Sequence, residues 1–508
     1  MKFKLSGYLT ATKKVEDSWV EEIIGNLKKE RILERGAPEG EGAKIEEWKT
    51  REDKIHINIS SGRYVRPHDA VFRLRNYLAR EMGKKRKIGV RDIFVERYEI
   101  ELELDDLPAG EVSLPFATVE INRKEKKARL VLQNLDEEFI KGNAVDRVIK
   151  RFCEKVRASH TGGKKEFSRL IEKSAEKEHK LGADPTREMI DRGWVKEFPG
   201  AGIWIIMPPY ACLIRAMYDL CIDEAAKKLG FEEIMLPRLI PLEVERKKGH
   251  LNIANEQFWV CPPVSRNPKD FEDYSDLVEI TRKPLPEKLK EKLKEPMFGL
   301  AYAQCEPFYQ IFEGEISDAE RLWKVYDING PTWRWEGGGL KGLERLNEFH
   351  RIEFVFIGTP EEVVKTRDMV LEESKRVLED VLDLQWKVDA TTAVYLEHAG
   401  KTEEEDDQFV KTYDLSAILP FKTQSREEAE LEIASFHVHK DFYAKRFHWK
   451  EKKNRELWSG CAGIGPTRWA FTFLARHGFE FEDWPQAIRE RIRKLPQVPR
   501  FENWPRVE

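Results

Sequence analysis

The chain has 508 residues, of which 41% are hydrophobic, so it is long enough to form two or three domains with cores of their own. Its 88 basic and 92 acidic side chains leave a net charge of -4, so a polyanion would have to be bound by a local basic patch and not by the field of the whole protein. No apolar run approaches the roughly 20 residues that span a bilayer, and the first residues lack the apolar core of a signal peptide, so we expect a soluble, cytoplasmic protein.

Residues 1–165 are predicted to form an α+β domain. Alternating or helical spacing of apolar residues predicts, in chain order, a strand over 54–59, a helix over 70–82, strands over 98–104 and 128–132, and a helix over 136–157. Two basic segments between these elements combine cations with an aromatic residue, a composition that suits phosphate contacts with a stacked base and is equally typical of a solvated loop. Their candidate RNA-binding cations are Arg63, Arg66, Lys84, Lys85, Arg86 and Lys87.

Residues 166–199 are predicted to be a linker and helical connection, with a glycine- and lysine-containing linker just before them at 160–165, and residues 200–508 a second domain. Its pattern predicts a long helix over 210–229, short strands over 233–236, 351–357 and 417–419, a charged surface helix over 287–295 and a helix over 469–476. The acidic run 403–407 is short enough to be a solvated loop.

Three motifs follow one another in the second domain. The first, about 210–241, places Gly230-Phe231 after the long helix and ends its strand at Pro237. The third, about 461–476, turns the chain at Gly463 and Gly465, so that Arg468, in the following helix, can lie over a purine or a polyphosphate. A turn followed by a surface arginine also explains the third motif taken alone.

The second motif, about 331–357, combines two charged residues with a glycine-rich loop. Arg334 and Glu336 are two residues apart, so on a strand they would face the same side. The loop 337–342 would then bring Arg345 and Phe349 over whatever this strand binds. That arrangement suits a bent nucleotide, and an ion pair beside a core aromatic is the alternative for each residue alone.

These motifs resemble those of the class II aminoacyl-tRNA synthetases, most closely the seryl-tRNA synthetases. Further matches are Gly342-Leu343-Glu344-Arg345 with Phe349 and Glu353, which resembles Gly-Leu-x-Arg-x-x-x-Phe-x-x-x-Glu; Tyr413-Asp414-Leu415, which resembles Tyr-Asp-Leu; and Glu432-Ile433-Ala434-Ser435 with Asp441-Phe442, which resembles Glu-Ile-x-Ser and Asp-Phe. The resemblance implies an α+β fold whose catalytic core is an antiparallel sheet flanked by helices, with a separate N-terminal tRNA-binding domain. It also implies activation of serine by ATP to seryl-adenylate, followed by transfer to tRNA(Ser).

The resemblance assigns a role in ATP binding to each charged motif residue. Arg334 would hold the α-phosphate and Arg345 the γ-phosphate, while Glu336 would bind the adenine amino group and Phe349 and Arg468 would sandwich the ring. Arginine suits these contacts because its guanidinium binds anions in a bidentate way and stacks on rings. Glu432 and Ser435 would carry Mg²⁺, which prefers oxygen ligands.

The N-terminal domain indicates which seryl enzyme the chain resembles. Residues 1–165 show no sustained heptads of the coiled-coil arm found in standard seryl enzymes. Together with 181–186 and 193–196 they resemble the rare type of methanogenic archaea, which holds one zinc ion in its amino-acid pocket by two cysteines and a glutamate. That resemblance implies Cys305, Glu353 and Cys461 as zinc ligands, with the fourth position open for the serine amino group.

The six cysteines are far apart and form no Cys-x-x-Cys pair, which indicates neither a disulfide framework nor a local zinc finger. Each cysteine alone is typical of an inert buried thiol. Cys305 and Cys461 differ from the rest because they lie at the edges of family motifs, whereas the other four do not: Cys153, Cys212, Cys221 and Cys261.

Around the amino acid the sequence departs from this type. Glu306, Ser435 and His437 are the expected contacts to serine, but the type has an asparagine in the segment that reads Glu432 to His437 here, and a tryptophan in the insertion where Tyr395 is the nearest large aromatic residue. These departures bear on side-chain specificity, because a pocket that recognises a hydroxyl discriminates through few polar groups.

Two other functions fit parts of the pattern. A synthetase-like ligase that charges a carrier protein with an amino acid uses the same adenylate chemistry but has no tRNA-binding domain. A non-catalytic RNA-binding paralogue would have lost Arg334, Glu336 or Arg468, and all three are present. The apolar content of the first motif also leads us to expect a C2 homodimer.

Overall fold

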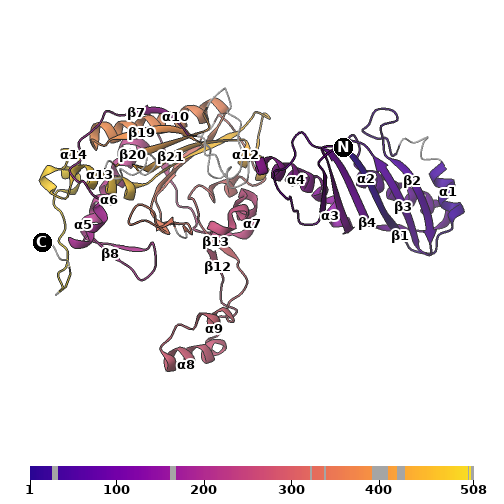
Figure 1. The fold of residues 1–508 in the computed structure, drawn as a ribbon, viewed down its shortest axis with the longest axis horizontal. Helices are drawn as coiled ribbons and strands as arrows, with labels where there is room; N and C mark the ends of the chain where they lie inside the picture. Colours follow the sequence, from indigo (N-terminus) through magenta and orange to yellow (C-terminus); the bar gives the residue numbers. More distant parts are fainter. Residues whose placement is uncertain are drawn as a thin grey trace. The chain divides into compact units, whose positions relative to one another are not determined.

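The computed structural model describes residues 1–25, 32–160, 168–320, 323–336, 339–391, 410–419, 421, 429–501 and 503–504. The chain divides into two compact units, Met1–Lys165 and Glu166–Glu508 (Figure 1). The expected linker 161–165, the acidic run 403–407 and Tyr395 lie outside the described residues. Among the helices of the described ranges, none is long and apolar enough to cross a membrane.

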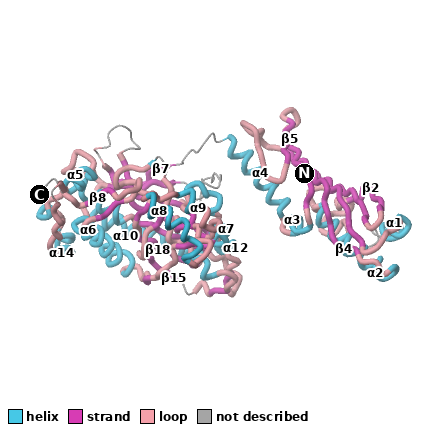
Figure 2. The backbone as a smooth tube through the Cα atoms, turned by 90° about the horizontal axis from the view of Figure 1, so that it is seen from below, coloured by secondary structure: helices cyan, strands magenta, loops and turns pink. Residues whose placement is uncertain are grey.

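The first unit is a six-stranded antiparallel sheet with helices packed on it. Its strand order is β2-β3-β1-β4-β6-β5, and α2 packs on β1, β3 and β4 (Figure 2). The strands are β1 (Lys2–Ala11), β2 (Lys44–Arg51), β3 (Lys54–Ser61), β4 (Val90–Glu103), β5 (Thr118–Asn122) and β6 (Lys127–Leu135), and the helices are α1 (Asp17–Gly25), α2 (Pro67–Arg86), α3 (Glu137–Lys141) and α4 (Ala144–His160). In β3 every second side chain is buried, which explains why its pattern was readable from the sequence.

The single helix expected over 136–157 is two helices. Gly142 ends α3, and Asn143, with a φ of 55°, lies in the left-handed region that stops a helix. Apolar residues keep the helical spacing on both sides of this break, because both helices face the same core.

The second unit is built on an eight-stranded sheet of order β10-β15-β18-β23-β21-β20-β19-β7, in which all pairs are antiparallel except β10 and β15. These strands are β7 (Ser168–Lys173), β10 (Glu232–Glu233), β15 (Trp323–Asp327), β18 (Ile352–Gly358), β19 (Trp386–Thr391), β20 (Thr412–Ile418), β21 (Glu430–Lys440) and β23 (Trp458–Ile464). The α-helices are α5 (Pro185–Asp191), α6 (Pro208–Cys221), α7 (Leu242–Lys248), α8 (Glu272–Thr281), α9 (Pro286–Lys290), α10 (Pro360–Arg376), α12 (Phe442–Arg446), α13 (Pro466–His477) and α14 (Gln486–Ile492).

Short strands complete this unit: β8 (Val195–Glu197), β9 (Trp204–Ile206), β11 (Leu239–Pro241), β12 (Trp259–Val260), β13 (Phe298–Leu300), β14 (Ile316–Ser317), β16 (Thr332–Trp333), β17 (Glu348–Phe349) and β22 (Lys450–Glu451). A π-helical turn, Ile222–Lys227, extends α6 and gives the long helix expected over 210–229. The surface helix expected over 287–295 is shorter, as α9, and follows α8 in a segment that stands apart from the sheet (Figure 1).

The eight-stranded sheet has one helical face and one face that carries the site. Ile352, Phe354 and Phe356 of β18 pack into a core with α6, α10 and α13, whereas Val355 and Ile357 belong to a separate cluster on the other side. Glu353 alternates with Phe354 and therefore shares the second face. The large helices thus cover one face, and the functional side chains gather on the other.

The helix expected within 166–193 is wrong for Ser168–Lys173, which form the edge strand β7. All six side chains of β7 are exposed, so no buried stripe marks the strand, and it is stabilised by backbone pairing with β19. Tertiary pairing therefore decides the conformation of this charged segment, against its helical spacing. The strand expected over 233–236 is likewise short, since β10 covers only Glu232–Glu233.

Candidate active site

The second and third motifs meet, together with the strand β21, in one pocket on the open face of the large sheet. Seven residues predicted from the motifs line it: Arg334, Glu336, Phe349, Glu432, Gly463, Gly465 and Arg468. Two glycines among them leave space at the end of β23, where Pro466 then begins α13. Motif residues that are far apart in the sequence are thus close together in space.

Arg334 is held at the centre of this pocket by two rings. Its guanidinium carbon lies 4.3 Å from the ring centre of Tyr302 and 5.4 Å from that of Phe349, which fixes the plane of the side chain. Burial would lower the pKa of Arg334, but Tyr302, Glu432 and Glu336 more than offset this, and the net shift is upward. A fixed, permanently charged guanidinium is suited to an anionic phosphate.

The other two arginines are held by different partners. Arg468 donates to the carbonyl oxygens of Glu344 and Glu432, over 3.1 and 2.7 Å, and so bridges motifs two and three. Arg345 lies 2.5 Å from the Glu336 carboxylate. Because Arg345 is exposed and Glu336 is largely buried, this pair can open toward solvent when phosphates compete for the arginine.

A β-bulge brings Glu432 and Ser435 to the same side of β21. Residues three apart on a regular strand face opposite sides, but Leu415 and Ser416 of β20 pair with Ala434 and Glu432, which leaves Ile433 as an extra residue. Glu432 lines the pocket, and Ser435 Oγ donates to Asp414 Oδ1 over 2.6 Å and lies 2.8 Å from His437 Nε2. Glu432 can therefore serve as an oxygen ligand, whereas Ser435 would have to leave a present partner to do so.

Asp414 is a polar residue of the site to which the motif pattern assigned no role. It accepts from Thr391 Oγ1 over 2.7 Å as well as from Ser435, and burial, with the Glu432 charge next, raises its pKa to about 7. Burial also lowers the pKa of His437 to about 3, so that its imidazole is neutral. Asp414, Ser435 and His437 thus form a hydrogen-bonded cluster on β20 and β21, in which burial disfavours the charged forms of Asp414 and His437.

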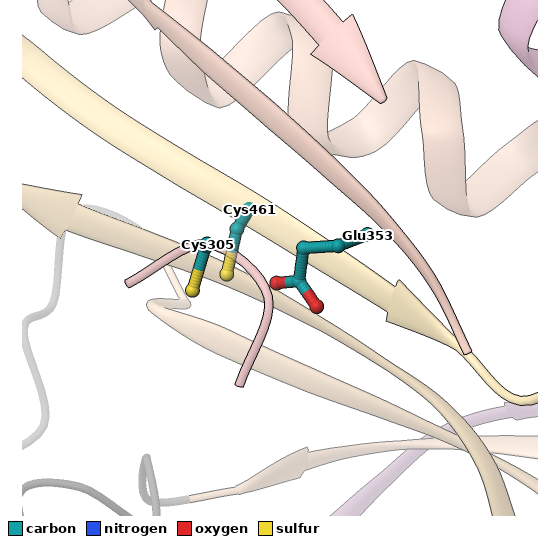
Figure 3. Close-up of side chains that lie close together, drawn as sticks. All are labelled: Cys305, Glu353 and Cys461. Atoms are coloured by element: carbon teal, nitrogen blue, oxygen red, sulfur yellow. The ribbon is translucent and has the colours of Figure 1, made fainter. Parts of the chain in front are cut away.

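Cys305, Glu353 and Cys461 meet beside this pocket, and all three are buried. Their ligand atoms lie within 4.8 Å of one another, and the carboxylate faces the two sulfur atoms (Figure 3). In the sheet, Glu353 pairs with Gly463, and Cys461 is the next residue on the same face of β23, which is why these side chains come together. No spacing in the sequence reveals this neighbourhood.

The chemistry of this trio fits zinc. A hydrogen bond between the thiols lowers the pKa of Cys305 and raises that of Cys461, so the two do not ionise alike. Among the described residues, Glu353 Oε1 is buried without a hydrogen-bond partner. Two thiols and an unsatisfied carboxylate oxygen form the soft and hard donor set that zinc accepts, with a fourth position open.

Arg351 also belongs to the site, although no motif singled it out. Its guanidinium contacts the Glu353 carboxylate, and burial, followed by repulsion from Arg334, lowers its pKa while Cys305 and Cys461 act in the opposite direction. Arg351 directly precedes β18 and is two residues before Glu353, so the alternation expected for a strand over 351–357 could have placed it on the same face. Cys461 Sγ also lies 3.5 Å from His439 Nε2, a neighbour that only the fold reveals.

Substitution of Gly463 is expected to displace Arg351. A methyl group there would lie 2.8 Å from Nη2 and 2.9 Å from Cζ of Arg351, well inside the roughly 3.5 Å of a normal contact. Gly463→Ala should lower serine-dependent pyrophosphate exchange by about 10²-fold, because an ångström of misplacement costs that much in an aligned site. Kinetics at varied serine and ATP measure the loss.

Gly465→Ala is the matched comparison, since its nearest neighbour to a new methyl is 3.5 Å away, an ordinary contact. It should cost far less activity. Wild-type kinetics in Gly463→Ala would show that Arg351 has no part in the reacting arrangement.

Glu306 does not line the pocket and is bound elsewhere. Its side chain is 1% exposed and lies 2.7 Å from Lys248 Nζ and 2.5 Å from His250 Nδ1. Ser435 and His437 do not line the pocket either, but Ser435 lies on the same side of β21 as Glu432, which does. The contact between serine and Glu306 stays a prediction without support from this geometry.

The basic residues of the first unit are partly engaged within that unit. Arg66 lies 2.8 Å from Asp146, Lys85 lies 2.8 Å from Glu22, and Arg63 donates to Tyr64 over 2.7 Å. Arg86 is packed over Trp19, with 5.3 Å to the ring centre, whereas Lys84 and Lys87 are exposed at the end of α2. These surface pairs are weak enough to be replaced by phosphates, so the six cations remain candidates.

Known proteins resemble the chain over its whole length. Residues 1–154 match the family model of a tRNA-binding domain, and residues 289–477 match that of the tRNA synthetase class II core domain (G, H, P, S and T). The type-2 serine--tRNA ligase of Methanopyrus kandleri is 40% identical, and that of Methanococcoides burtonii is 36% identical, each over 99% of both chains. A crystal structure of M. kandleri SerRS in complex with A. aeolicus tRNASec is 38% identical with a TM-score of 0.81, over 99% of both chains.

Proposed function

The chain belongs to the type-2 serine--tRNA ligases of the class II synthetases, and we propose that its two units divide the reaction between them. The second unit activates serine with ATP, and the first binds tRNA(Ser). The observation that carries this proposal is the convergence of Arg334, Glu336, Phe349 and Arg468 on one pocket directly beside the trio Cys305, Glu353 and Cys461.

The first step is attack of the serine carboxylate oxygen on the α-phosphorus, with pyrophosphate as the leaving group. Arg334 binds the α-phosphate and neutralises the charge that develops there, and Arg345 binds the γ-phosphate. Phe349 and Arg468 hold the adenine between them, and Glu336 accepts from its amino group. Catalysis is alignment and charge stabilisation, with no protein nucleophile.

Cys305, Glu353 and Cys461 would hold zinc, which supplies a Lewis-acidic position for the serine amino group when bound. Ser435 and His437 lie on the same face of β21 and bind the side chain of the amino acid. Because the His437 imidazole is neutral, it can accept or donate to a hydroxyl without a charge in the pocket. Glu432 and Ser435 would provide oxygen ligands for a Mg²⁺ ion that also binds the ATP phosphates.

The second step transfers the seryl group to a ribose hydroxyl of the terminal adenosine of tRNA. The first unit holds the tRNA through its cations, and its match to a tRNA-binding domain favours this function over a carrier-protein ligase. A non-catalytic paralogue is disfavoured because Arg334, Glu336 and Arg468 are all in place.

We also propose that the protein is a homodimer. Motif 1 forms α6, its π-helical extension and the edge strand β10, and the chain just beyond leaves Met235 74% and Leu239 50% exposed. Exposed apolar side chains next to a sheet edge suit an isologous interface.

Deletion of residues 1–165 should separate the two steps. We expect serine-dependent exchange of pyrophosphate into ATP to stay within about threefold of the full chain, since the second unit has its own core, whereas charging of tRNA(Ser) falls by more than about 10²-fold as the phosphate contacts are lost. Both proteins should sediment as dimers. Charging that is unaffected by the deletion, or exchange that needs an amino acid other than serine, would refute this division.

A further inference from the structure

Four buried titratable side chains form a cluster that the reaction does not use. Glu245, Lys248 and Glu306 have side chains exposed by at most 1%, and His250 by 9%. Lys248 Nζ lies 3.0 Å from Glu245 Oε2 and 2.7 Å from Glu306 Oε2, and His250 Nδ1 lies 2.5 Å from Glu306 Oε1. Lys248 is thus an ammonium enclosed between two carboxylates.

A buried ion cluster of this kind is a poor source of stability, because the desolvation of its charges offsets their attraction. Removal of one partner, however, leaves a charge buried alone. Of the two contacts of Lys248, the one to Glu306 is the shorter, 2.7 Å against 3.0 Å to Glu245.

The cluster is connected to the zinc trio through the chain itself. Glu306 directly follows Cys305, so the position of its carboxylate limits the position of the Cys305 backbone. Lys248 is the last residue of α7, which begins directly after motif 1 and the strand β11. A side chain at the end of the helix that follows motif 1 thus contacts the residue next to a proposed metal ligand.

A second connection leads to the ATP side of the pocket. The ring of His250 meets the ring of Tyr302 edge-on, with 5.5 Å between centres, and the Tyr302 hydroxyl donates to Glu256 over 2.9 Å. The Arg334 guanidinium lies over the Tyr302 ring, 4.3 Å from its centre. The same cluster therefore supports both Cys305 and the ring that orients Arg334.

We propose that Lys248 is a positioning residue of the aminoacylation site: through Glu306 it fixes Cys305 for metal and serine, and through His250 it supports the Tyr302 ring beneath Arg334. This inference rests on the proposed zinc ligation and adds to it a residue that touches neither substrate nor metal. Outer partners of metal ligands commonly matter nearly as much as the ligands.

A metal site at the cluster is the competing explanation. Glu245, His250 and Glu306 have ligand atoms within 4.8 Å of one another. The Lys248 ammonium already lies between the two carboxylates, 3.0 Å from one and 2.7 Å from the other, so its own charge would repel a cation placed there. The metal content of the wild-type protein separates the two explanations, since a second equivalent of metal would overturn the positioning role.

The test is Lys248→Met in the full-length protein, with Lys177→Met as the matched control. Lys177 is also a lysine held by two carboxylates, 2.9 Å from Glu379 and 2.8 Å from Asp383 and 10% exposed, but it lies outside the pocket. The first quantity compared is the rate of zinc release to a chromogenic chelator, and the second is the KM for serine in pyrophosphate exchange. The third is the rate at which Cys305 is alkylated in chelator-treated protein, which peptide mass spectrometry follows.

In Lys248→Met we expect zinc release and Cys305 alkylation to be faster, and the KM for serine higher, each by roughly tenfold or more. Lys177→Met should leave all three within about twofold of wild type at a similar loss of thermal stability. Glu245→Gln keeps the shape of its side chain and should shift the same quantities less, in the same direction, which guards against a variant that does not fold.

Folded Lys248→Met or Glu245→Gln with all three quantities within about twofold of wild type would overturn the inference. Wild-type protein that binds no zinc would instead refute the proposed metal site. The alkylation rate and the KM would then still decide whether Lys248 positions the loop of Cys305.

Discussion

Cys461→Ala is expected to lose the bound zinc and about 10³-fold of its serine-dependent pyrophosphate exchange, since a Lewis-acidic ion contributes several kcal/mol to substrate binding and alignment. Cys461 is 3% exposed, and its sulfur lies within 4.8 Å of the ligand atoms of Cys305 and Glu353. Two donors remain after the substitution, too few for a stable zinc site. Metal analysis of the purified protein, together with exchange kinetics, measures both effects.

The control for this experiment is Cys221→Ala. Cys221 is equally buried, at 2%, but it belongs to the core around α6 and has no metal-ligating neighbour among the described groups that could hold an ion. It should keep full zinc content and activity, with a modest loss of stability from the smaller side chain. Zinc content and exchange that are unchanged in Cys461→Ala would exclude the proposed metal centre.

Arg334→Lys is expected to lower kcat for pyrophosphate exchange by about 10² to 10³-fold, although the charge is kept. An ammonium cannot make two parallel bonds to a phosphate, and it loses the flat contact that the guanidinium makes between Tyr302 and Phe349. Because the contact is strongest when charge develops at the α-phosphorus, kcat should fall more than the KM for ATP rises. Steady-state exchange at varied ATP concentration measures kcat and the KM for ATP separately.

Arg192→Lys is the comparison variant. Arg192 also lies over an aromatic ring, 5.0 Å from the centre of Phe479, and pairs with Glu188 and Glu480, but it does not line the pocket. We expect wild-type kinetics for it. An Arg334→Lys enzyme as active as Arg192→Lys would refute the role of Arg334 at the α-phosphate.

Prediction from the sequence succeeded for elements that bury one face, because such burial leaves a periodic pattern of apolar residues in the segment itself. The strand β3 and the helix α2 each bury one face against their own unit, so alternation and helical spacing show them. It failed at β7, whose exposed side chains leave no such trace and whose conformation depends on the partner strand β19. It also missed the break at Asn143, because both sides of the break face one core.

The site shows the same difference. Arg334, Arg468, Glu432 and Cys461 were named because the ordered motifs that contain them resemble those of a known family. Arg351, His439 and Lys248 were not, because their importance comes from neighbours distant in the chain: Glu353 and Gly463 for Arg351, Cys461 for His439, and Glu306 for Lys248.

By itself, then, the sequence determined the family, the two-unit organisation and the residue types that bind ATP, because motif order and hydrophobic periodicity are properties of the chain. Only the tertiary structure decided which side chains share a site. The pairing of β18 with β23 brings Glu353 beside Cys461, and the bulge at Ile433 turns Glu432 and Ser435 to one face. Register and bulges arise from contacts between strands, and no single segment contains the information that sets them.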